Sequence, residues 1–169
     1  MKKIILMVLL LLIAAGVAQA RVSDSKYQYG VGVILGEPNG FSGKYWLNNK
    51  EAYDLSISIR MAHVYFIQGA YLYHNYDVFK NLTALKNFSE ASLYYGAGLS
   101  LIIDSEHRFN RRDENDTYDN LLGVKGTVGI SYMIPQQPFE VFFEVSPIFN
   151  LTPVSNFNFA GGVGVRYSF

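Results

Sequence analysis

The chain has 169 residues, half of them hydrophobic, with 14 basic residues balanced by 14 acidic ones and no cysteine. This length predicts one domain, and the charge balance offers neither a basic surface for nucleic acid nor an acidic tail. Without cysteine, a disulfide framework and thiolate chemistry are excluded. Beyond the first twenty residues no run approaches 18 apolar residues, so helical membrane spans are not expected. The apolar content, with 13 Tyr, 12 Phe and 15 Gly, must therefore be buried in another way.

Residues 1–20 have the layout of a secretory signal peptide. Two lysines precede an apolar run over residues 4–15, and the A-x-A sequence at 18–20 gives a small-residue cleavage site. The apolar run is shorter than the ~20 residues that a membrane-spanning helix needs, which disfavours an uncleaved anchor. We therefore expect cleavage before Arg21. The mature domain, residues 21–169, would carry 12 basic and 14 acidic residues, because two of the basic ones are Lys2 and Lys3.

Eight stretches of the mature chain alternate between apolar residues and polar or small ones. The last stretch, FNFAGGVGVRYSF, places aromatic and branched side chains at every second position and Asn, Ala, Gly, Arg and Ser between them. Successive side chains of a strand point to opposite faces, so each stretch predicts a strand with one apolar face. Turn residues such as Glu37-Pro38-Asn39-Gly40 separate the stretches. The eight predicted strands are 27–36, 41–47, 52–61, 64–74, 93–103, 121–133, 139–149 and 157–169.

The position of the charges decides between a soluble and a membrane protein. No residue on the predicted apolar faces is charged, whereas a soluble barrel would carry its charges on the outside. A charge on the lipid-facing wall costs about 2–4 kcal/mol for Arg or Lys, so its absence there is typical of a membrane barrel. We therefore predict an all-β protein, an eight-stranded antiparallel up-and-down transmembrane β-barrel. The charges assigned to its interior are Lys44, Asp54, Arg60, Lys125, Glu140, Glu144 and Arg166.

An even number of strands brings both ends of the barrel domain to the periplasmic side. The links at 37–40, 62–63, 104–120 and 150–156 are then expected on the outer surface, and those at 48–51, 80–92 and 134–138 in the periplasm. The link at 80–92 is long for a periplasmic turn.

Several segments carry a resemblance to a known group of proteins. They are GVGVILGEPNGFSGKYWL (30–47), YHNYDVF (73–79), LYYGAG (93–98), FEVFFEVSPIFNLTP (139–153) and the last stretch, 157–169. The chain resembles the small eight-stranded outer-membrane barrels of Gram-negative and spirochaetal bacteria, of OmpA- or OmpX-like size, and more closely an uncharacterised outer-membrane β-barrel family. The resemblance implies the fold and a bacterial outer-membrane location, and it supplies no catalytic residues. Val165, Tyr167 and Phe169 are similar to the signal that the barrel-assembly machinery recognises.

The histidines and the charged loop are the candidates for catalysis and binding. His63, His74 and His107 are not paired with a Ser and a carboxylate at strand spacing, so we expect rim or surface histidines and no enzyme. The acidic loop 104–120 lacks the EF-hand pattern, and neither a metal nor a cofactor is predicted. Its arginines, Arg108, Arg111 and Arg112, offer a possible contact with lipopolysaccharide phosphates or a host protein.

The charged residues of the predicted strands all lie on the inner face, and no other group of functional residues is placed as consistently. Eight strands leave just enough room for side chains, and Trp46, Phe66, Tyr94 and Phe142 share the interior with the charges. We expect a lumen plugged by ion pairs, with a narrow ion path as the alternative. The predicted function is a non-enzymatic barrel that presents loops 104–120 and 150–156 for envelope integrity or binding. A small pore and a lipid-active enzyme remain the alternatives. We expect a monomer in outer-membrane lipid, with an unknown extracellular ligand.

Overall fold

The computed structural model describes residues 27–37, 39–61, 64–80, 90–104, 121–152 and 155–169. The predicted signal peptide, His63, His107 and the three arginines of the charged loop lie outside these residues.

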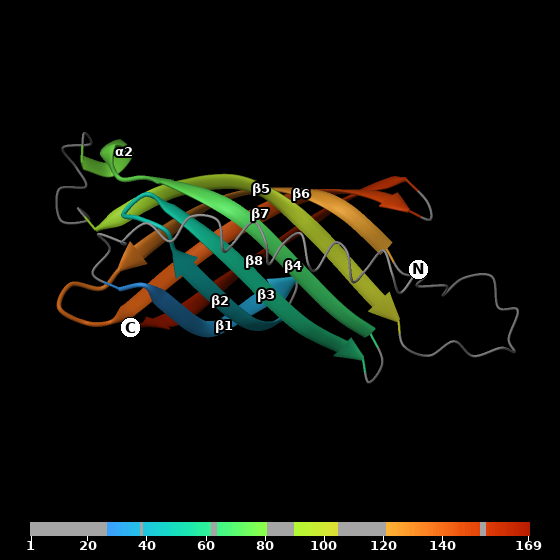
Figure 1. Ribbon diagram of the computed structural model, residues 1–169, viewed down its shortest axis with the longest axis horizontal. Coiled ribbons are helices and arrows are strands. Elements are labelled where there is room, and N and C mark those ends of the chain that lie inside the picture. The colour runs from blue at the N-terminus through green and yellow to red at the C-terminus, as the bar shows by residue number, and fades with distance from the viewer. Residues whose placement is uncertain (1–26, 38, 62–63, 81–89, 105–120, 153–154) are drawn as a thin grey trace, which may run out of the picture.

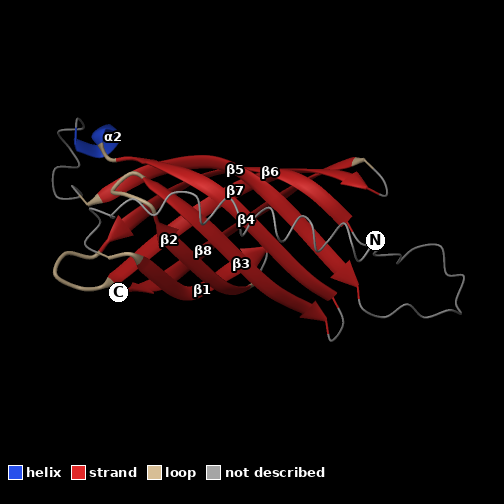
Figure 2. Cartoon of the chain, viewed as in Figure 1, coloured by secondary structure: helices blue, strands red, loops and turns tan. Residues whose placement is uncertain are grey.

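Eight strands form a closed barrel in which each strand pairs antiparallel with its neighbour in the sequence (Figures 1 and 2). The first and last strands close the ring, with Gly30 opposite Ser168 and Glu37 opposite Gly161. This confirms the predicted fold class. The strands are β1 Tyr29–Glu37, β2 Gly40–Trp46, β3 Glu51–Met61, β4 Val64–Asn75, β5 Ala91–Asp104, β6 Leu121–Met133, β7 Phe139–Thr152 and β8 Asn156–Ser168.

Strand bounds differ from the predicted ones mainly at two links. β7 continues to Thr152, so most of the predicted loop 150–156 belongs to strands. Asn150 pairs with Asn156 in the ladder, and the two amide side chains are hydrogen-bonded to each other, which lets polar residues continue the strands there. In the predicted link 80–92, β5 already begins at Ala91, and the short helix α2, Asp77–Lys80, follows β4. Among the described residues, no helix is both long and apolar enough to span a membrane.

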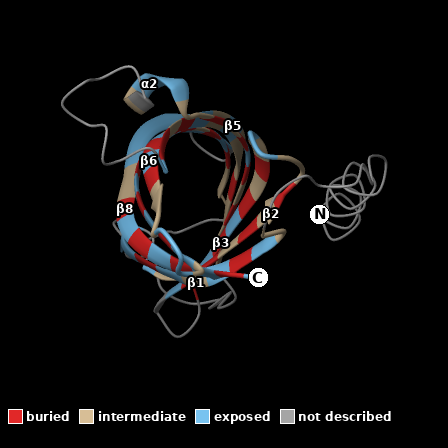
Figure 3. Cartoon of the chain, turned by 90° about the vertical axis from the view of Figure 1, so that its left-hand side faces the viewer, coloured by how far each residue is buried: buried red, intermediate tan, exposed pale blue. Residues whose placement is uncertain are grey.

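Side-chain exposure alternates along the strands as the sequence pattern predicts (Figure 3). On β8, Val163, Val165 and Tyr167 are exposed on the outer wall, and Gly162, Gly164 and Arg166 are buried inside. The described polar and charged residues that are buried include six of the seven predicted interior charges. The described barrel therefore has an apolar wall and a polar interior.

Aromatic side chains gather on the outer wall at two levels. At the end that contains Phe169, ring contacts join Tyr29 to Tyr45, Tyr53 to Tyr71, Tyr73 to Tyr95, and Phe139 to Tyr167. At the other end of β8, Phe157 and Phe159 contact each other edge to face, with centroids 4.9 Å apart. Eight to ten residues of a strand tilted by about 40° separate the two levels, roughly 21–26 Å, which matches the apolar band of an outer-membrane barrel.

Pro147 interrupts the ladder between β6 and β7. The pairs Lys125–Ile148 and Val128–Val145 belong to the ladder, but the two positions between them do not. Pro147 has no N–H to donate, so a break at this residue is expected. The hydroxyls of Thr127 and Ser146 lie 3.0 Å apart inside the barrel at the same level, and this side-chain hydrogen bond joins the two strands across the break.

Inward-facing glycines make room for the lumen aromatics. A Cβ added to Gly164 would overlap the Phe142 ring, and one added to Gly129 would overlap the Tyr94 ring. An outward-facing glycine such as Gly43 differs, since its added Cβ would meet nothing closer than 3.9 Å. The narrow interior therefore depends on small residues opposite the large ones.

We expect Gly164→Ala to destabilise the folded barrel by about 1–3 kcal/mol, because the new methyl group overpacks the interior against Phe142. Gly43→Ala is the matched control and should change stability little. The measurement is denaturant unfolding of the refolded protein, followed by circular dichroism. Equal stabilities of the two variants would contradict this account of the lumen.

Candidate functional site

The strands β2 and β8 lie on either side of β1, and a charged side chain from each extends into the interior over β1. At this level the inward-facing residues of β1 are glycines. Gly30 lies between Lys44 of β2 and Ser168 of β8, and Gly32 lies between Ser42 and Arg166. A Cβ on Gly30 would lie 3.7 Å from both the Lys44 Cβ and the Arg166 Cδ. The long side chains of Lys44 and Arg166 therefore pass over β1 and meet in the lumen.

Arg166 is the centre of this cluster. It is 1% exposed, and its two terminal nitrogens donate to different carboxylates, Nη2 to Asp54 and Nη1 to Glu140 at 3.3 Å. Its Nε donates to the Ser42 hydroxyl at 2.9 Å. The guanidinium carbon lies 3.6 Å from the centroid of the Phe142 ring, a cation–π contact. Arg166 thus bonds to three strands, β2, β3 and β7, and stacks on a second side chain of β7.

Glu140 joins Arg166 to Lys44. One carboxylate oxygen accepts from Lys44 at 2.6 Å and the other accepts from Arg166 at 3.3 Å. The Lys44 ammonium also lies 4.7 Å from the Trp46 ring and 5.3 Å from the Tyr94 ring. We call the four side chains Lys44, Asp54, Glu140 and Arg166 the charge cluster.

Two further predicted interior charges are buried apart from the charge cluster. Lys125 donates to the side-chain oxygen of Gln68 at 3.0 Å. Glu144 accepts from the Tyr94 hydroxyl at 3.1 Å. Among the described residues, neither of these two charged side chains forms an ion pair. Arg60 belongs to β3, but its side chain lies outside the described part of the structure.

His74 corrects one prediction. We expected a rim or surface histidine, but its side chain is completely buried, and its Nε2 lies 3.2 Å from the Lys44 ammonium. The imidazole lies between Trp46 and Tyr94, with ring centroids 4.5 and 5.1 Å away. The alternation of β4 already placed His74 on the inward face, and that signal was outweighed by its position near the end of the strand.

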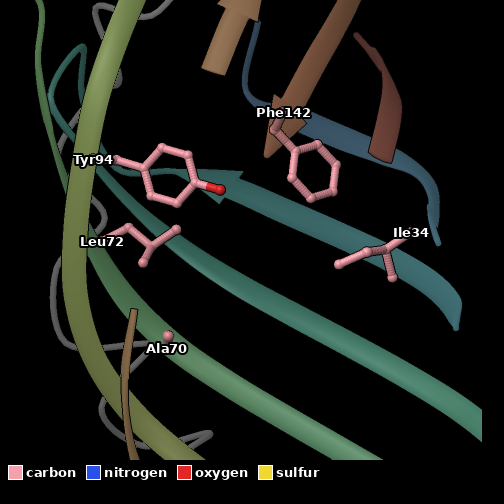
Figure 4. Close-up of a cluster of buried hydrophobic side chains, with 5 residues drawn as sticks. All are labelled: Ile34, Ala70, Leu72, Tyr94 and Phe142. Carbon is pink, nitrogen blue, oxygen red and sulfur yellow. The ribbon is translucent and has the colours of Figure 1, made fainter. Parts of the chain in front are cut away.

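Aromatic and aliphatic side chains fill the space beside the charges. Tyr94 from β5 and Phe142 from β7 both point into the interior (Figure 4). Ile34, Ala70 and Leu72 complete this buried cluster. Three further side chains bond to the interior charges but were not among the predicted ones, because that prediction considered only charged residues. They are Ser42, Gln68 and His74.

The described residues offer no recognisable catalytic arrangement. His74 contacts Lys44 through Nε2, and its Nδ1 has no hydrogen-bond partner, so no described Ser–His–carboxylate triad is formed. The hydroxyls of Ser56 and Ser168 are also buried without a partner. Within the described part of the chain, no group of three or more His, Asp or Glu residues is placed to hold a metal ion.

Comparisons with known proteins agree with the fold. No protein-family model matches the chain, and no curated protein matches it significantly. Among solved structures it is similar to the N-terminal β-barrel domain of Pseudomonas aeruginosa OprF, with a TM-score of 0.57 and 15% identity over 83% of this chain and 95% of that one. Neisserial surface protein A aligns at a TM-score of 0.47 and 16% identity, over 83% and 93% of the two chains. At these identities the likeness concerns the fold alone.

Removal of the bridging carboxylate should be costly. We expect Glu140→Gln to destabilise the barrel by about 3–5 kcal/mol, because Lys44 loses its carboxylate partner and Arg166 keeps only Asp54. Glu144→Gln is the matched control: its amide oxygen still accepts from Tyr94, and the expected cost is below about 1 kcal/mol. Denaturant unfolding of both variants measures the difference. A Glu140→Gln barrel as stable as Glu144→Gln would show that the charge cluster contributes little.

Proposed function

We propose that the protein is a bacterial outer-membrane β-barrel with a side-chain-plugged, non-conducting lumen. The observation that carries the proposal is the division of side chains: the outer wall is apolar, and the buried charges face inward, where four of them form the charge cluster. An apolar wall closed on itself satisfies the backbone without water, as a bilayer requires.

The low exposure of the interior side chains supports the proposed plug. Lys44, Glu140 and Arg166 are each at most 3% exposed, as are Tyr94 and Phe142 beside them. Ion conduction needs a wetted path with sites that a solute can enter and leave. Side chains that bond to one another across the lumen and exclude water favour a plug over a pore.

The orientation proposed for the barrel places the end with Phe169 in the periplasm, where the turns 47–50 and 134–138 are short. The predicted links 37–40, 62–63, 104–120 and 150–156 would then lie at the outer surface. We propose that two of them, 104–120 and 150–156, present a surface for envelope integrity or for an extracellular ligand, with Arg108, Arg111 and Arg112 as candidate contacts. The protein acts in this role without catalysis and as a monomer.

We further propose how the protein is assembled into the membrane and to which family it belongs. Val165, Tyr167 and Phe169 lie on the outer wall of the closing end of the barrel and are exposed, where the barrel-assembly machinery can bind them. Export through the predicted signal peptide, residues 1–20, belongs to the same pathway. The family proposed is the uncharacterised outer-membrane β-barrel family with spirochaetal members that the sequence resembles.

Electrical recording tests the plug. The mature protein, refolded and inserted into a planar bilayer, should show no reproducible single-channel conductance, because bonded side chains occupy the lumen. Circular dichroism must first show that the sample is folded β-sheet. A reproducible conductance whose ion preference changes in Glu144→Gln or Lys125→Gln would replace the plug with a pore.

Epitope accessibility tests the location and orientation. A short peptide tag inserted within 105–120 should be labelled by antibody on intact cells, since that link is proposed to face outward. The same tag inserted at Gln136–Gln137 should be labelled only after the outer membrane is permeabilised. Labelling in the reverse order would overturn the orientation, and labelling of neither tag in permeabilised envelopes would argue against outer-membrane insertion.

A further inference from the structure

The barrel wall is lower at β1 and β2 than at the strands on either side. The β1–β8 ladder ends at Glu37–Gly161, although β8 begins five residues earlier, at Asn156. The β2–β3 ladder ends at Gly40–Ser58, although β3 continues to Met61. Figure 1 shows the β1–β2 hairpin ending short of its neighbours. We call this region the wall step, comprising 156–160 of β8, Ile59 of β3 and Leu35 and Phe41 of the hairpin.

Among the described residues, no strand pairs with the backbone groups at the wall step. Tyr29 and Phe169 exchange both backbone hydrogen bonds, at 3.0 and 2.8 Å, so every second residue of β8 directs its N–H and C=O toward β1. By this alternation Phe157 and Phe159 direct theirs to the same side, beyond the end of the β1–β8 ladder. The bond from Leu47 to Glu51 sets the same alternation on β3, where Ile59 lies beyond the last residue paired with β2.

The outer face of the wall step is the most exposed apolar surface that the described residues offer. Six large hydrophobic side chains are at least 57% exposed. Five of them belong to the wall step, and the sixth, Phe169, lies at the opposite end. The five are Leu35 at 65%, Phe41 at 72%, Ile59 at 63%, Phe157 at 57% and Phe159 at 66%.

The wall step has both exposed apolar side chains and backbone groups that pair with no described strand, and an occupant has to match both. Exposed Phe157 and Phe159 lie at the second aromatic level, where hydrocarbon gives way to lipid head groups. An open sheet edge is not tolerated in hydrocarbon, because each unsatisfied backbone group there costs several kcal/mol. The occupant must therefore bring apolar surface for the side chains and hydrogen-bonding groups for the backbone edge.

A second copy of the chain does not fit this edge. Antiparallel pairing of two β8 edges has its two-fold axis perpendicular to the sheet, which here lies in the plane of the membrane. The second barrel would then be upside down. A single extended peptide does not fit either, because β8 and β3 are about 14 Å apart across the two missing strands, and one added strand would expose its own edge.

We propose that the wall step binds one acyl lipid of the adjacent membrane leaflet. The acyl chains lie against Phe157, Phe159 and Ile59. The ester, amide or hydroxyl groups that link the chains to the head group bond to the free N–H and C=O groups of β8. A lipid carries both kinds of group at the depth where the wall step lies. The strand edge that it would cover, from Asn156 to Ala160, is about 13 Å long. This inference rests on the proposed membrane insertion.

Native mass spectrometry of the full mature chain tests the proposal. The protein is inserted into phosphatidylethanolamine vesicles, with or without a lipid A-type glycolipid, and gently released into detergent. We expect one retained lipid per chain, and comparison of the two vesicle types identifies whether a phospholipid or a glycolipid is retained. Protease protection of the same vesicles measures insertion separately, so failed insertion and failed lipid binding give different results.

The main variant closes the wall step. Four residues are added to each strand of the β1–β2 hairpin between Glu37 and Gly40, with apolar side chains outward and polar ones inward. Retained lipid should fall by about tenfold, because the added strands cover the β8 edge and the exposed rings. Insertion of eight residues at Gln136–Gln137, at the opposite end, is the control and should leave retention unchanged.

A second pair of variants guards against misfolding of the lengthened hairpin. Phe157→Ala with Phe159→Ala removes the proposed acyl contact and should also lower retention by about tenfold. Val141→Ala with Phe143→Ala removes exposed side chains of the outer wall from β7, where strands pair with it on both sides, and should leave retention unchanged. Absence of retained lipid in the inserted wild type, or equal retention in both alanine pairs, overturns the proposal.

Discussion

The ion pairs between Arg166 and the carboxylates around it constrain which residues can line the rest of the interior. A guanidinium buried in an eight-stranded barrel must have its charge balanced nearby, and Asp54 and Glu140 supply that balance from β3 and β7. Glu140 in turn holds Lys44, so both basic residues of the charge cluster bond to one carboxylate. Glycines on β1 leave the space through which Lys44 and Arg166 reach it. Strand order, small residues and charge placement therefore serve the same few contacts.

The surrounding solvent explains why the barrel is polar inside and apolar outside. In hydrocarbon the outer wall can bear branched and aromatic side chains, whereas charges must turn inward and pair. The same rule makes the wall step notable, because there the backbone of β8 continues beyond its partner strand. The Pro147 break shows the opposite solution, since Thr127 and Ser146 bond across it inside the barrel.

Prediction from the sequence succeeded where the period of two is long and regular. The stretch 121–133 was predicted with the bounds that the structure gives, and Lys125 was correctly assigned to the interior. It was weaker at strand ends, where Asn150 was assigned to a loop. There a partner across the ladder, Asn156, decides the matter. His74 was misjudged for a similar reason, since its surroundings come from β2 and β5.

The sequence by itself determined the number of strands and the inward face of six of the predicted interior charges. These follow from alternation along one strand, which is a local property. Only the tertiary structure decided which charges pair. Glu140 bonds to both Lys44 and Arg166, while Lys125 and Glu144 bond instead to Gln68 and Tyr94. Such choices depend on the stagger of strands around the closed barrel, which places residues distant in the chain at one depth, and no single strand contains that information.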